Sequence, residues 1–140
     1  MVAMVLVDLT EEGTFTYRQP VLTWVKQHYP KVVTLDVDAA SEPAMLGYAQ
    51  KLLQEARFCV VFLKTSPKQR LGVAAAFIET ILQKGAAAAV SLEGEQPQIV
   101  SILKARPAIG FHHSVQQNDW QPFLASSLEN SLKMETGLLE

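Results

Sequence analysis

The 140-residue chain is 49% hydrophobic and 19% charged, a composition typical of one folded domain that is large enough to bury a core. Its 12 Lys and Arg residues and 14 Asp and Glu residues give a net charge of −2, and this scattered, balanced charge argues against nucleic-acid binding. We expect one domain at residues 1–134 and a C-terminal tail at residues 135–140.

The N-terminal segment contains a continuous apolar run, Val2–Val7, which is typical of a strand buried on both faces of a sheet. The run reaches Asp8 within a few residues and no basic segment precedes it, so we expect neither a signal peptide nor membrane association. The single cysteine, Cys59, cannot form an internal disulfide. A reducing compartment is therefore predicted, which means a cytoplasmic location.

A first helix is predicted from Pro20, which suits a first helical turn, to Pro30, which stops the helix. Lys31–Val37 predicts a second strand, and Ser41 opens a second helix. We expect that helix to bury one stripe of apolar side chains. The stripe consists of Met45, Tyr48, Ala49, Leu52, Leu53 and Ala56.

The most hydrophobic strand is predicted at Phe58–Leu63, with Cys59 as a buried structural thiol. The helix after it ends at Gly85, a residue typical of helix C-termini. Ala86–Leu92 is ambiguous because alanine favours helices, but its place between Gly85 and a Glu-Gly-Glu turn favours a strand. The apolar stripe of the third helix is Leu71, Ala74, Phe77, Ile78, Ile81 and Leu82.

Prolines bound the fourth helix, which begins at Pro97 and stops at Pro107. Ala108–His112 predicts a short fifth strand, and Asn118 or Asp119 caps the last helix. The inward side chains of these two helices are Ile99, Ile102 and Leu103, then Trp120, Phe123, Leu124, Leu128 and Leu132.

The regular alternation of strands and helices predicts an α/β fold, a three-layer α/β/α sandwich around a flavodoxin-like five-stranded parallel sheet. The strand order that we expect is 2-1-3-4-5. This order places a switch point between the first and third strands, and ligands of such sheets bind beyond the carboxyl ends of the strands at that point.

The candidate ligand-binding residues follow the first and third strands, whose loops would meet at one rim of the sheet. Their hydroxyl groups and backbone amides suit a phosphate or a ribose, but the glycine spacing of dinucleotide and P-loop motifs is missing. A solvated turn with a helix cap explains the same residues. At the end of the fifth strand, a histidine adds a candidate acid or base. The candidates are Thr10, Glu11, Gly13, Thr14, Thr65, Ser66, Lys68 and His113.

No metal site and no cofactor are predicted. His112 and His113 are neighbours in a strand, so their side chains would point to opposite faces and could not hold one metal ion. Asp36 and Asp38 share one side of the second strand, where they suit magnesium or a ribose as well as a helix N-terminus or solvent.

Two better-known sites of this fold class fit the sequence poorly. The segment Thr10–Thr16 resembles the hydroxyl-rich loop with which flavodoxins hold the phosphate of FMN, but Glu11 and Glu12 would repel that phosphate. Lys64 and Thr65 stand where a response-regulator receiver would need its phosphoaccepting aspartate. Flavin binding and phosphorelay chemistry are therefore disfavoured.

Three consecutive segments resemble the middle of a TIR (Toll/interleukin-1 receptor) domain. A strand ending in acid, Val32–Asp38, is followed by a helix ending in Leu52–Arg57 and by a hydrophobic strand with a Ser-Pro turn, Phe58–Pro67. The resemblance implies a flavodoxin-like sheet and an adaptor-like domain that binds its own kind through loops and helix faces.

Enzymatic TIR domains, like the related nucleoside deoxyribosyltransferases, use a glutamate on the helix after the third strand to handle a ribosyl group. Here Leu71–Phe77 holds no glutamate, and Glu79 comes about a turn late. We therefore expect a self-association or partner-binding module, as a homo-oligomer or with a protein partner, rather than an enzyme. The alternative is a small enzyme or sensor of a nucleotide-like ligand at the rim formed by Thr10, Gly13, Thr14, Thr65 and Ser66.

Overall fold

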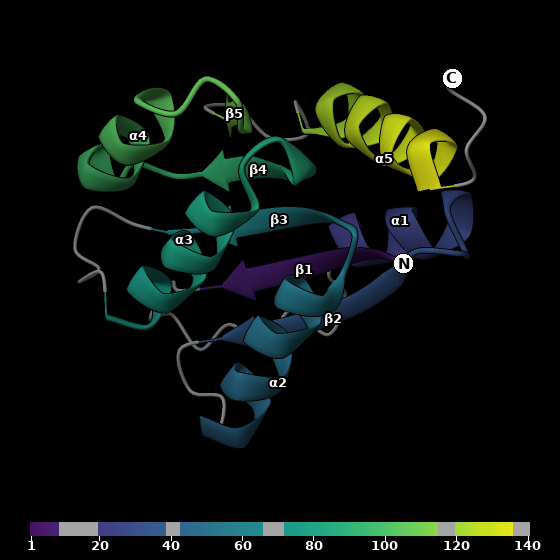
Figure 1. The fold of residues 1–140 in the computed structure, drawn as a ribbon, viewed down its shortest axis with the longest axis horizontal. Helices are drawn as coiled ribbons and strands as arrows, with labels where there is room; N and C mark the ends of the chain where they lie inside the picture. Colours follow the sequence, from purple (N-terminus) through teal and green to yellow (C-terminus); the bar gives the residue numbers. More distant parts are fainter. Residues whose placement is uncertain (9–19, 39–42, 66–71, 115–119, 136–140) are drawn as a thin grey trace.

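The computed structural model describes residues 1–8, 20–38, 43–65, 72–114 and 120–135. Within these ranges the strands are β1 (Val2–Asp8), β2 (Val33–Asp38), β3 (Phe58–Lys64), β4 (Ala88–Glu93) and β5 (Gly110–Ser114). All pair in parallel, in the order β2-β1-β3-β4-β5 (Figure 1). The predicted fold class and strand order are both confirmed.

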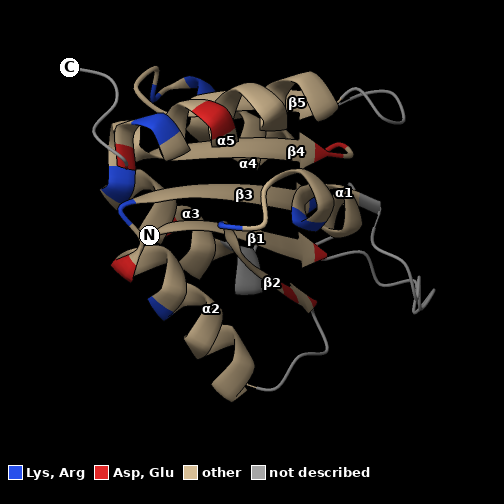
Figure 2. Ribbon diagram, turned by 90° about the vertical axis from the view of Figure 1, so that its right-hand side faces the viewer, with Lys and Arg blue, Asp and Glu red and all other residues tan. Residues whose placement is uncertain are grey.

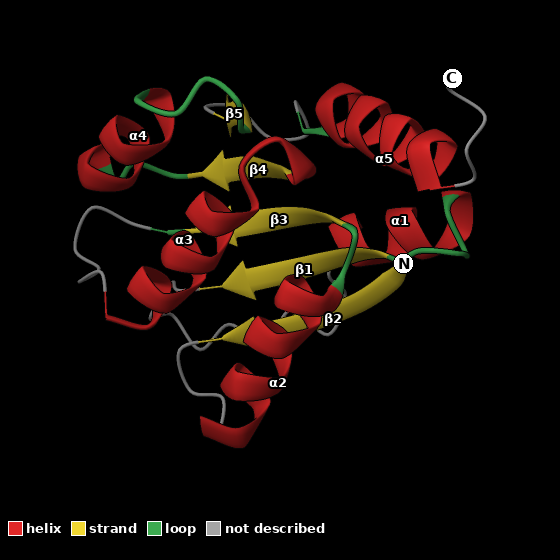
Figure 3. Cartoon of the chain, viewed as in Figure 1, coloured by secondary structure: helices red, strands yellow, loops and turns green. Residues whose placement is uncertain are grey.

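Helices cover both faces of this sheet (Figure 3). They are α1 (Pro20–His28), α2 (Pro43–Glu55), α3 (Gly72–Lys84), α4 (Pro97–Lys104) and α5 (Gln121–Glu135). Side chains of α2, α3 and α4 form one core with the sheet, and side chains of α1 and α5 form a second core on the opposite face. The three layers follow from these two cores.

The central strand β1 shows why its sequence lacks polar residues. Val5 and its alternate neighbours face the core under α2 and α3, whereas Met4 and its alternate neighbours face the core under α1 and α5. Both side chains are fully buried. A parallel strand with helices on both sides needs apolar residues at every position. In β3, Cys59 is only 1% exposed, which confirms the predicted buried thiol.

Three strands begin later than the sequence predicted, in each case because a turn occupies the first residues. Before β2, the amide of Val32 donates to the carbonyl of Tyr29, at 3.1 Å. Before β4, Gly85–Ala87 form a turn of 3-10 helix. Before β5, the amide of Ile109 donates to the carbonyl of Arg106, at 3.0 Å, so the strand is Gly110–Ser114 instead of Ala108–His112.

The stripe predicted for α2 is correct in its second half and wrong in its first. Ala49, Leu52 and Leu53 are buried, but Met45 is 42% exposed and Tyr48 is 57% exposed. The physical reason is the position of the helix. Its first turns extend past the edge strand β2 (Figure 1), and of Pro43–Tyr48 only Leu46 packs against the core. We call this segment, Pro43–Tyr48, the α2 overhang.

The other helices bury most of the predicted side chains, but four are only partly buried, namely Leu82, Ile102, Phe123 and Leu132. Phe77, Ile78 and Ile81 are buried on α3, and Gly85 follows that helix with a φ of 58°, as expected of a terminating glycine. Ile99 and Leu103 on α4 and Leu124 and Leu128 on α5 are buried, as is Trp120 directly before α5. Leu71, Asn118 and Asp119 lie outside the described residues.

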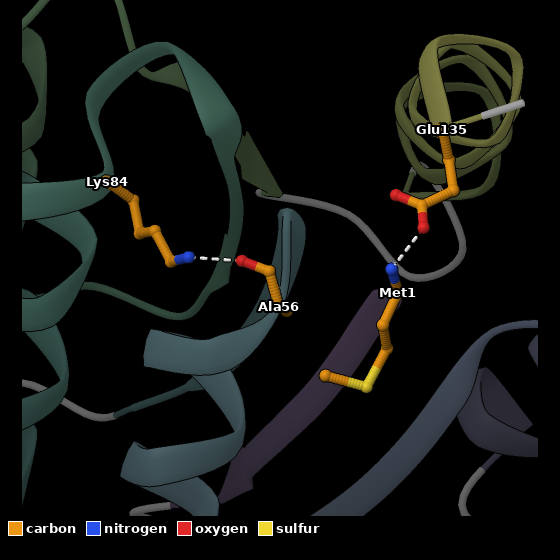
Figure 4. A network of polar contacts seen from close by, with 4 residues as sticks. All are labelled: Met1, Ala56, Lys84 and Glu135. Atoms are coloured by element: carbon orange, nitrogen blue, oxygen red, sulfur yellow. Dashed lines mark hydrogen bonds and ion pairs between the residues drawn. The ribbon is translucent and has the colours of Figure 1, made fainter. Parts of the chain in front are cut away.

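Polar contacts tie several helix ends to the rest of the fold. The Lys84 amino group donates to the carbonyl oxygen of Gln54, at 2.9 Å, and to that of Ala56 at the end of α2 (Figure 4). The amino group of Met1 pairs with the carboxylate of Glu135, where α5 ends, one residue into the predicted tail. Among the described residues, no helix combines the length and hydropathy that a membrane span requires.

Candidate functional site

The carboxyl ends of the strands meet at one edge of the sheet, as the parallel topology requires. The pairing of the strands sets Asp8 beside Lys64, and Lys64 beside Glu93. Figure 2 shows acidic residues at the ends of β1, β2 and β4 along this edge. The amino group of Lys64 lies 3.9 Å from the carboxylate of Glu93. The charges on the two central strands thus partly balance each other.

The segments that leave β3 and β4 are bonded to each other directly beyond this edge. The backbone amide of Thr65 donates to the carbonyl oxygen of Glu93, at 3.0 Å. Thr65 is 5% exposed, so its backbone is held inside the fold. The pairing of β3 with β4 therefore continues one residue past the last strand position of β3.

Gly94 occupies a position that only glycine fits. Its φ is 101°, a backbone conformation that other residues rarely adopt. A Cβ atom added there would lie 2.0 Å from the carbonyl oxygen of Thr65. The turn after β4 is therefore pressed against the segment after β3, and no side chain fits between them.

A histidine at the end of β5 is bonded to the same turn after β4. Nε2 of His113, on β5, donates a hydrogen bond to the carbonyl oxygen of Gly94, at 2.7 Å. Gly94 thus touches Thr65 on one side and His113 on the other. We call the group Thr65, Glu93, Gly94 and His113 the rim cluster.

The rim cluster contains two of the residues that the sequence singled out, Thr65 and His113. Glu93 and Gly94 were not predicted as site residues, because the sequence indicated only a turn at that point. A glycine between two glutamates directly after an apolar strand was the available signal, because such a glycine often marks a positive φ. The remaining candidates lie outside the described residues and are Thr10, Glu11, Gly13, Thr14, Ser66 and Lys68.

The two neighbouring histidines point to opposite faces of the sheet, as predicted. The ring of His112 stacks on Phe123 of α5, with centroids 5.4 Å apart. The ring of His113 lies on the other face, 6.4 Å from that of Phe111. No three His, Cys, Asp or Glu side chains of the described segments gather into a possible metal site.

Cys59 lies far inside the sheet and is poorly suited to act as a nucleophile. Burial raises the pKa of its thiol to about 11, although the charge of Lys84 acts in the opposite direction. The thiol is therefore protonated at neutral pH, and the thiolate is the reactive form.

Three acidic residues outside the rim cluster, Asp36, Asp38 and Glu79, are open to solvent. Asp36 and Asp38 lie on the same side of β2, as expected, and both are exposed. Glu79 is also exposed, and it lies seven residues into α3, which corresponds to about 10 Å along a helix. The side chain of Glu79 therefore does not extend the rim cluster.

The fold that surrounds the rim cluster is a flavodoxin-like α/β domain with strand order 2-1-3-4-5. No protein-family model matches the sequence, and no curated protein matches it. Among solved structures, the chain is similar to one in the crystal structure of the RPS4 and RRS1 TIR domain heterodimer. The TM-score is 0.54 at 14% sequence identity, and the similarity covers 94% of this chain and 96% of the other. The chain therefore has a TIR-like fold.

Proposed function

We propose that this chain is a TIR-like interaction module that works by self-association. The observation that carries the proposal is the fold itself, which corresponds over 94% of this chain to a TIR domain crystallised in a heterodimer of two TIR domains. Fold alone does not determine function, so the proposal also needs a surface suited to association.

Exposed apolar side chains provide such a surface. Several large hydrophobic residues of the described segments are more than a third exposed, among them Val33, Met45, Tyr48 and Met134. Met45 and Tyr48 lie three residues apart on one helix, so they are neighbours on its surface. Clustered exposed apolar groups are typical of association sites, whereas single ones are common on any protein.

We further propose that the protein acts in the cytoplasm. The chain has one cysteine, Cys59, and that thiol is buried and free. Such a thiol is suited to a reducing compartment, where disulfides are rare.

Light scattering after size-exclusion chromatography, repeated over a concentration series, tests self-association. We expect the average mass to rise above that of the 15.4 kDa chain as concentration increases. A mass that stays at the monomer value up to several hundred micromolar would contradict the proposal.

A second candidate function is the binding of a small nucleotide-like ligand at the rim. The observation that favours it is the meeting of Thr65 and His113 at Gly94, at the carboxyl ends of three adjacent strands. Parallel sheets with this strand order bind ligands beyond those ends. In this proposal Thr10, Gly13, Thr14 and Ser66 complete the site.

A thermal-shift panel of nucleotides, NAD and flavins tests the second candidate. A ligand at 100 times its dissociation constant stabilises the folded state by about 2.7 kcal/mol, which is readily measured. We expect His113→Gln to reduce the shift, and His28→Gln, on an exposed helix end, to leave it unchanged. Absence of any shift across the panel would refute this candidate.

A further inference from the structure

We draw no further inference here: the strongest candidate, the buried hydroxyl group of Ser91 on β4, lies between Phe62 and His112 in the core under α1 and α5 without a hydrogen-bond partner among the described residues, and nothing in that part of the structure shows what would bind to it.

Discussion

The rim cluster and the α2 overhang each contain a glycine, and the two glycines have opposite surroundings. At Gly94 a Cβ would lie 2.0 Å from the backbone of Thr65, whereas at Gly47 nothing lies within 4 Å. At the rim, a glycine is required because the segments after β3 and β4 are in direct contact. At the overhang glycine, an added methyl group would have free space.

This difference indicates how each region relates to function. The polar groups of the rim cluster are already bonded to each other, through Thr65 to Glu93 and His113 to Gly94. A ligand there would bind to a fixed scaffold. The overhang has an exposed apolar surface at Met45 and Tyr48, and the buried residues of α2 all lie in its second half. Changes at the rim should therefore alter folding stability more than changes at the overhang.

The largest expected effect comes from Gly94→Ala. The substitution places a methyl group against the Thr65 carbonyl at a φ of 101°, so the turn after β4 has to move. We expect a loss on the order of 3 kcal/mol in the free energy of unfolding. Urea denaturation followed by circular dichroism measures it.

Gly85→Ala is the matched control for that substitution. Its φ is 58°, but a Cβ there meets no atom within 4 Å. Only the backbone strain remains, which amounts to about 1 to 2 kcal/mol. If Gly85→Ala were as destabilising as Gly94→Ala, the close contact with Thr65 would not be what constrains the rim.

The bond between His113 and Gly94 should contribute less. His113→Leu removes the 2.7 Å hydrogen bond and leaves the carbonyl oxygen of Gly94 without that donor. We expect a loss of about 1 kcal/mol in the free energy of unfolding. His28→Leu, at the exposed end of α1, should change stability by less than about 0.5 kcal/mol. Equal effects of the two substitutions would mean that the rim bond adds nothing.

The scaffold of the rim could be predicted from the sequence because it depends on local patterns. Apolar runs such as Val2–Val7 leave no polar face, which requires helices on both sides of a parallel sheet. Once the strand order is 2-1-3-4-5, the carboxyl ends of neighbouring parallel strands must lie side by side at one edge of the sheet. Thr65 and His113 could therefore be assigned to one edge before their contacts were known.

The contacts themselves depend on geometry that the sequence does not encode locally. The bond from His113 to Gly94 requires the register of β4 with β5, and the sequence pattern predicted β5 two residues too early. Met45 and Tyr48 were predicted to be buried because their spacing continues the stripe of Leu52. Periodicity shows which side of a helix is apolar, but not how far the sheet extends beneath it.

The smallest effect on stability, and the only gain, is expected for Gly47→Ala. Glycine inside a helix is less favourable than alanine by about 0.5 to 1 kcal/mol, and the added methyl group has free space. The free energy of unfolding, measured at a concentration where the chain is monomeric, should rise by that amount. A fall in the free energy of unfolding on Gly47→Ala would contradict the free space found around this position.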